Sequence, residues 1–283
     1  MRSPKFPLLL SSLPLVAFAL RAATPAVPAA TATPETVAKP PAPAPVIAGV
    51  KPEVGKPFEN SLGMKFAPVG PAKVLFGIWD VRVQDFEAFA SAYGIAKIAL
   101  KFEQAPTHPV VNVSWDEAQD FCTWLTQKEQ AAGRLSKTQF YRLPTDSEWS
   151  LAVGLAEPAD GGSPESKDRQ INDVYPWGTT WPPPKGAGNY DASLETDTYL
   201  GTSPVGTFTA NKYGLFDMGG NVWQWCEDFY DGTSGPHVVR GASYFNSAVN
   251  NLLLSKRDSY EANIHSALVG FRVVIADKSG AGL

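Results

Sequence analysis

The sequence predicts one α+β domain with little regular secondary structure, preceded by an N-terminal tether. Residues 1–57 are rich in Ala, Pro and Thr and almost lack aromatic residues, whereas nearly all Trp, Tyr and Phe residues come after this stretch. The remainder contains a few short helix and strand patterns. Between residues 159 and 235, Gly, Pro, Asn and Asp recur every few positions and regular periodicity is absent. Composition therefore favours a single loop-rich domain over two domains.

The overall charge argues against one class of partner. The formal net charge is −4, so the chain has no basic field to hold a phosphate backbone. We expect no nucleic acid among its partners.

Residues 1–23 have the features of a secretory signal peptide. Arg2 and Lys5 form a short positive region, the apolar run 8–20 follows, and small residues stand near the end, at 17–23. This run is shorter than the roughly 20 residues that a bilayer-spanning helix needs. We expect an exported protein, periplasmic or secreted. The open alternative is an uncleaved signal that anchors the chain, which would be its only membrane contact.

The rest of the chain divides by composition. Residues 24–57 are rich in Pro and Ala and offer little apolar surface to bury, so they are predicted to be a disordered linker. The domain is predicted to span residues 58–277, and residues 278–283 to form a flexible tail.

Helix signals cluster in the first half of the domain. Residues 80–93 place apolar side chains on one helical face, and Gly94 ends the pattern. Ser114 is followed three positions later by Glu117, and Thr145 by Glu148. Each pair is typical of a capping box at the start of a helix.

Strand signals are shorter. They stand at 141–143, 237–240 and 270–275. The long stretch 159–235 needs something to organise its loops. Buried Trp side chains and bound cations, which tie together carbonyl and carboxylate oxygens, are the expected organisers.

A series of motifs follows one order along the chain. They are Asn60-Ser-Leu-Gly-Met64, His108-Pro-Val110, Val113-Ser-Trp115, Tyr141-Arg-Leu-Pro-Thr145, Tyr175-Pro-Trp-Gly178, the run from Tyr213 to Trp225, Val239-Arg-Gly241 and Gly270-Phe-Arg272. In this order they resemble the formylglycine-generating enzyme (sulfatase-modifying factor) family. The resemblance implies a C-type-lectin-like α+β fold.

The resemblance also locates a catalytic site that this chain lacks. The family's enzymes oxidise a sulfatase cysteine to formylglycine with copper held by two cysteines. Those cysteines follow a motif that Gly241-Ala-Ser243 matches, and their positions fall at Asn246 and Asn251, with Ser243 in the same groove. Asn cannot supply the soft thiolate that selects Cu(I). We therefore expect no copper and assign no catalytic residue; Cys122 and Cys226 lie elsewhere and are expected to be free and buried.

The resemblance further implies two calcium positions, which suit hard oxygen ligands in flexible loops. The first would use the side chains of Asn189 and Asp197 and the carbonyls of Tyr190 and Tyr199. The second would use the side chains of Asp217 and Gln224 and the carbonyls of Gly220 and Val222. The alternative is that these Asp and Asn residues only cap turns.

The expected function is that of an exported, calcium-stabilised, non-catalytic module that binds or scaffolds a protein or peptide in the envelope or outside the cell. The segment 243–251 is its expected contact surface. One alternative is a formylglycine-generating oxidase, or a related oxidation enzyme, that works by another route on a protein substrate. A second is a lectin-fold protein with a diversified ligand-binding surface. Trp223 and Trp225 could offer a sugar platform, but alternating aromatics are more often core.

Overall fold

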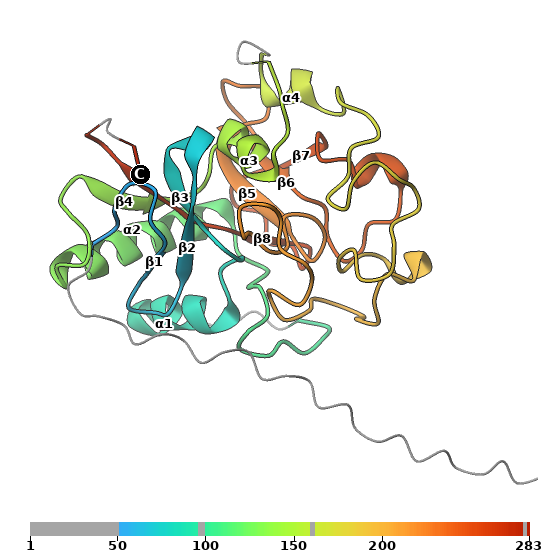
Figure 1. The fold of residues 1–283 in the computed structure, drawn as a ribbon. Coiled ribbons are helices and arrows are strands. Elements are labelled where there is room, and N and C mark those ends of the chain that lie inside the picture. The colour runs from blue at the N-terminus through green and yellow to red at the C-terminus, as the bar shows by residue number, and fades with distance from the viewer. Residues whose placement is uncertain (1–50, 96–99, 159–161, 280–281) are drawn as a thin grey trace, which may run out of the picture. The chain divides into compact units, whose positions relative to one another are not determined.

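Two curled sheets and a few helices carry the fold (Figure 1). The computed structural model describes residues 51–95, 100–158, 162–279 and 282–283. The predicted signal peptide and most of the predicted linker lie outside the described residues. No helix in the described part of the chain is long and apolar enough to cross a membrane.

The predicted helices form, each held by its cap. Helix α2 (Trp115–Ala131) begins as expected: Ser114 Oγ accepts a hydrogen bond from the Glu117 N–H at 3.1 Å, and Glu117 returns one to the Ser114 N–H at 2.9 Å. Helix α3 (Asp146–Val153) repeats the device with Thr145 and Glu148. Helix α1 spans Val83–Tyr93 and starts three residues later than predicted, because Val81 is held extended by Phe271 and Val110. A short helix α4 follows at Pro164–Lys167.

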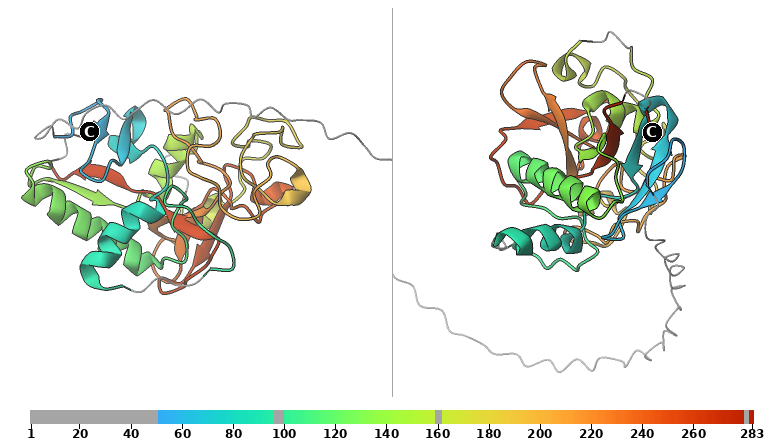
Figure 2. Two further views of the ribbon diagram at one scale, coloured as in Figure 1. Left: turned by 90° about the horizontal axis from the view of Figure 1, so that it is seen from below. Right: turned by 90° about the vertical axis from the view of Figure 1, so that its left-hand side faces the viewer.

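The first sheet has the order β1-β2-β3-β9-β4 and is antiparallel throughout. Its strands are β1 (Phe58–Glu59), β2 (Lys65–Val69), β3 (Val74–Gly77), β4 (Gln139–Arg142) and β9 (Val274–Asp277). Helices α1 and α2 lie together on one side of it (Figure 2). The aromatic rings of Phe86 and Phe121 stack across the two helices, with ring centroids 5.9 Å apart.

The second sheet has the order β7-β6-β5-β8. Its strands are β5 (Trp223–Phe229), β6 (His237–Arg240), β7 (Arg257–Tyr260) and β8 (Val269–Phe271). Trp223, Gln224, Trp225 and Cys226 are all buried in β5. The interpretation of the two Trp residues as core is therefore confirmed, and they offer no exposed platform for a sugar.

The strand predicted at 270–275 is in fact two strands in different sheets. Strand β8 pairs in parallel with β5, whereas β9 pairs with β3 and β4. The break falls at Arg272, whose buried guanidinium donates to the carbonyls of Gly77 and Phe216. The chain thus passes from one sheet to the other, and each of two buried apolar clusters draws side chains from both sheets.

Described residues at both predicted borders of the domain make contacts with the first sheet. Within the predicted linker, the carbonyl of buried Pro52 accepts a hydrogen bond from Gln139 at 2.9 Å. Beyond the predicted end, Leu283 is buried and its N–H donates to the Lys73 carbonyl at 2.9 Å. Apolar and amide groups at both borders thus pack on the first sheet.

The cysteine prediction is confirmed. Cys122 lies on the buried face of α2 and Cys226 in β5; both are free and buried. Burial raises the pKa of each thiol well above its usual value, so neither is a reactive thiolate.

Candidate functional site

The segment 243–251 follows β6 and forms a tight turn. Ser243 is buried, and the side-chain oxygen of Asn246 accepts from the Ser243 N–H at 2.8 Å and from its hydroxyl at 2.9 Å. The Asn246 N–H donates in return to the Ser243 carbonyl. The Asn246 amide oxygen is thus used to close its own turn, and does not project freely into a groove as the resemblance implied.

Asn251 stands in a different position. It lies half-buried at the end of a single 3₁₀ turn, Val249–Asn251, and its side chain makes no hydrogen bond to any described residue. Neither asparagine is a soft ligand, and no group of three or more His, Cys, Asp or Glu side chains that could hold a metal ion exists among the described residues. The segment contains no thiol and no imidazole, so it offers no soft ligand for a copper ion.

The same segment exposes apolar side chains. Phe245 is 66% exposed and Val249 is 39% exposed. The loop that carries Leu200, which is 92% exposed, is tied to this segment: Phe102 packs against Gly201 and makes an edge contact with Tyr244. A contiguous apolar patch is a common mark of an interaction surface. We call Leu200, Phe245 and Val249 the apolar rim.

The first predicted calcium set is brought together by the loops between α4 and β5. Asp197 accepts from the N–H groups of Tyr190 at 3.1 Å and Tyr199 at 2.8 Å. Asn189 is fully buried, and its amide nitrogen donates to Gly201 and Asn221. The Asn189 side-chain oxygen is buried without any partner.

This set fits a hard cation. A buried oxygen without a donor is costly unless something satisfies it, and a cation would do so. No described backbone N–H donates to the carbonyls of Tyr190 or Tyr199, so both are free to act as ligands. The Asp197 carboxylate has acceptor sites beyond those it uses. The loop is also closely packed: a Cβ at Gly220 would lie 2.6 Å from the Asn189 carbonyl oxygen.

The second predicted set does not fit in the same way. The Gln224 side-chain oxygen accepts from Trp149 Nε1 at 3.0 Å and from Arg272 Nε at 3.2 Å, and both donors are buried. Its amide nitrogen donates to the Asp217 carbonyl at 2.7 Å. Gln224 is therefore a structural bridge, and its oxygen has no room for a cation. Gly220 and Val222 lie in the same turn, but without Gln224 the predicted set loses a ligand.

A buried charge cluster beside this turn was not predicted. Asp80, Asp217 and Arg272 are all buried, and Arg272 Nη2 lies 3.5 Å from an Asp80 oxygen. Burial raises the pKa of Asp80 to about 8; Arg272 opposes the rise and Asp217 adds to it. Burial likewise raises the pKa of Asp217 to about 6. The three residues come from distant parts of the sequence, so no local sequence pattern predicts that they lie together.

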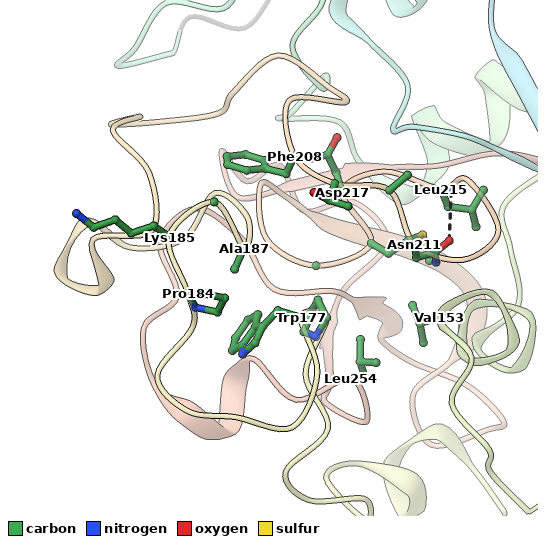
Figure 3. A pocket seen from close by; sticks show the side chains of 16 residues that line it. Val153, Trp177, Pro184, Lys185, Ala187, Phe208, Asn211, Leu215, Asp217 and Leu254 are labelled. Carbon is green, nitrogen blue, oxygen red and sulfur yellow. Dashed lines mark hydrogen bonds between the residues drawn. The ribbon is translucent and has the colours of Figure 1, made fainter.

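A cavity of about 420 Å³ opens next to Asp217 (Figure 3). Its walls come from α3, the Pro176–Trp177 turn, the loops at 184–187 and 208–211, and Leu254. None of the copper-ligand positions lines it. The sequence signal that lies in its wall is the motif Tyr175-Pro-Trp-Gly178, which supplies Pro176 and Trp177 and which the sequence analysis used only for the family resemblance.

Comparison with known proteins agrees with this architecture. Residues 79–277 match the family model described as the sulfatase-modifying factor enzyme 1-like domain. The formylglycine-generating enzyme of Thermomonospora curvata is 36% identical over 135 residues, covering 44% of this chain and 35% of that protein. The inactive C-alpha-formylglycine-generating enzyme 2 of Bos taurus is 34% identical over 152 residues, covering 50% of this chain and 40% of that protein. The matches thus span well under two thirds of these relatives.

Solved structures show the fold. PvdO from Pseudomonas aeruginosa superposes with a TM-score of 0.56 at 20% identity, covering 79% of this chain and 99% of that one. Treponema denticola variable protein 1 gives a TM-score of 0.51 at 20% identity, covering 81% of this chain and 92% of that one. The predicted C-type-lectin-like α+β fold is confirmed.

Proposed function

Because the chain belongs to the sulfatase-modifying factor enzyme 1-like family, we propose that it is an exported, calcium-stabilised member that binds a protein or peptide without generating formylglycine. One observation carries the proposal. The two positions that the resemblance assigns to copper-binding cysteines hold Asn246 and Asn251, and Asn246 spends its oxygen on Ser243. A neutral amide used in this way can neither ionise nor hold Cu(I).

Two comparisons support a non-catalytic member. Some of the curated relatives that match this chain are themselves named inactive, those of Bos taurus and Mus musculus. Export is supported by the signal-peptide features of residues 1–23.

In this proposal the calcium ion has a structural role. Asn189 and Asp197, with the carbonyls of Tyr190 and Tyr199, would hold the ion. When bound, it would supply positive charge to oxygens that converge in loops with little regular structure. The chain's own contribution is to hold these loops close, through Asn221 and the absence of a side chain at Gly220.

The apolar rim is the proposed contact surface. Phe245 projects from the turn that Asn246 closes, and Val249 begins the following 3₁₀ turn; a fixed turn lowers the cost of ordering Phe245 on binding. An exposed aromatic is the kind of residue that dominates interface energetics. We propose an apolar peptide segment as ligand, because the rim offers aromatic and aliphatic side chains and no charged one.

A displayed library of random peptides, selected on the immobilised domain, tests this surface. Peptides rich in apolar residues should be enriched, and Phe245→Glu should abolish their binding. Val54→Glu is the matched control, since Val54 is 64% exposed and lies outside the rim. Selected peptides that bind Phe245→Glu as well as wild type would contradict the proposed surface.

A further inference from the structure

The 420 Å³ cavity beside Asp217 lies within the size range of small-molecule sites. Its wall mixes polar and apolar groups, and two of its side chains are aromatic, Trp177 and Phe208. In Figure 3, Trp177 and Pro184 are seen on one side of the space and Phe208 and Asp217 on the other. Nothing in the peptide-binding proposal uses this cavity.

Asp217 supplies the negative charge in its wall. Its Oδ2 accepts the Gly206 N–H at 2.7 Å, and its own carbonyl accepts from Gln224 at 2.7 Å, so the carboxylate is firmly positioned. Its other oxygen receives no hydrogen bond from a described residue. The only other charged residue in the lining is Lys185, which is exposed and extends away from the cavity in Figure 3.

Asp217 forms no ion pair with Arg272, the buried arginine nearby. Arg272 spends its donors on Gly77, Phe216 and Gln224, and its nearest carboxylate is Asp80, at 3.5 Å. Among the described residues, Arg272 makes no hydrogen bond or ion pair to Asp217, so one Asp217 oxygen stays available to a ligand. A cation in the cavity can approach Asp217 directly, whereas Asp80 is fully enclosed.

We propose that this cavity binds the ammonium group of a primary alkylamine, with the ammonium on Asp217 and the alkyl chain between Trp177 and Phe208. A charge-assisted hydrogen bond to a buried carboxylate is a strong contact. The faces of aromatic rings attract a cation, and the aliphatic side chains in the wall contact the alkyl chain of the amine.

The alternatives fit less well. A calcium ion needs six to eight oxygen ligands, but the lining offers one carboxylate and an Asn211 amide that is fully used by Ala152, Tyr213 and Leu215. A sugar needs several polar side-chain partners for its hydroxyls, and besides Asp217 this lining offers only Thr209, Asn211 and the exposed Lys185. An alkylammonium ion can place one N–H on Asp217 and leave the other two to water at the open side of the cavity, while its carbon chain contacts Trp177 and Phe208.

The test is a ligand-observed NMR titration of the full chain in calcium-free buffer. The probes are n-butylamine, n-butanol and butyrate, which share a carbon chain and differ in charge. Butylamine should bind, butanol about 10-fold more weakly because it lacks the charge-assisted bond, and butyrate not at all. Equal binding of butylamine and butanol would overturn the proposal.

Variants locate the site. Asp217→Asn keeps the shape and removes the charge, and should weaken butylamine by about 10-fold while leaving butanol unchanged. Asp231→Asn, at an exposed acid outside the cavity, should change neither. If Asp217→Asn fails to fold, Phe208→Leu provides the second variant and should weaken butylamine more than butanol. Unchanged affinity in the folded variants would sink the assignment.

The same chemistry has two sources, a free amine or a lysine side chain. Nα-acetyl-lysine amide distinguishes them. If it binds as tightly as butylamine, the cavity can bind a lysine side chain of another protein. If it does not bind, the ligand is a free amine. Competition by added calcium at Asp217 would instead show a metal site and contradict the proposal. None of these outcomes depends on the apolar rim, so failure here leaves the peptide-binding proposal intact.

Discussion

Asp146 shows how much a single buried residue organises. Its carboxylate lies between the guanidinium groups of Arg240 and Arg257, all three buried, and Arg257 also pairs with Glu157 at 2.7 Å. Arg240 lies over the Trp149 ring, 4.3 Å from its centroid. The network ties α3 to β6 and β7. Burial alone would raise the pKa of Asp146, but the two arginines outweigh it and the pKa lies below its usual value.

Asp146→Asn should therefore lower the free energy of unfolding by about 3–5 kcal/mol, because it leaves buried arginines without their partner. Urea titration measures this, with Asp231→Asn as the exposed control. The lowered pKa also sets a pH dependence. The stabilisation is present above the unfolded pKa near 3.8 and is lost as the pH falls through the lower folded pKa. A variant as stable as wild type at pH 7 would refute the role given to Asp146.

The two asparagines at the copper-ligand positions should differ. Asn246→Ala removes the acceptor of two hydrogen bonds from Ser243 and should cost about 1–2 kcal/mol. Asn251→Ala removes no hydrogen bond and should stay within about 0.5 kcal/mol of wild type. Thermal unfolding of the two variants measures this difference. Equal losses of unfolding free energy would mean that Asn246 does not close the turn through Ser243.

Elements were predictable where the signal is local. The capping boxes at Ser114 and Thr145 placed α2 and α3, since a cap needs only residues three positions apart. Strand β5 was missed because its first four residues are buried on both faces and do not alternate. The positions of the missing copper ligands rest on the order of motifs alone and stay a prediction. The cavity could not be predicted, because its wall joins six separate segments.

The cap itself is testable. Ser114→Ala should cost about 1 kcal/mol by leaving the Glu117 N–H without its side-chain acceptor. Ser234→Ala, at an exposed serine outside any helix, is the control. Chemical denaturation of the two variants gives the comparison, and an unaffected Ser114→Ala would show that tertiary packing alone fixes the start of α2.

At the scale of the whole molecule, the loops between α4 and β5 form the side of the domain away from α1 and α2 (Figures 1 and 2). They contain little regular structure, so their order depends on side-chain hydrogen bonds and, in our proposal, on calcium. Binding to the native state alone adds about 2.7 kcal/mol when calcium is at 100 times its dissociation constant.

Chelation should therefore lower the melting temperature of the wild type. Asp197→Ala should abolish the response to calcium, whereas Asp191→Ala, a half-buried neighbour outside the set, should retain it. Asp217→Ala should also retain the response, since the second set does not fit a cation. Identical melting curves of the wild type with calcium and with chelator would exclude the proposed ion.

The central claim is that this family member binds without catalysing, and oxygen uptake tests it most directly. The full chain is supplied with one equivalent of Cu(I) and a cysteine-containing peptide of the sulfatase type, with a formylglycine-generating enzyme as positive control. We predict no oxygen consumption above that of free copper and no loss of the peptide thiol, because Asn246 and Asn251 cannot hold the metal. Stoichiometric copper retention with conversion of the peptide cysteine to an aldehyde would contradict the account and establish an oxidase.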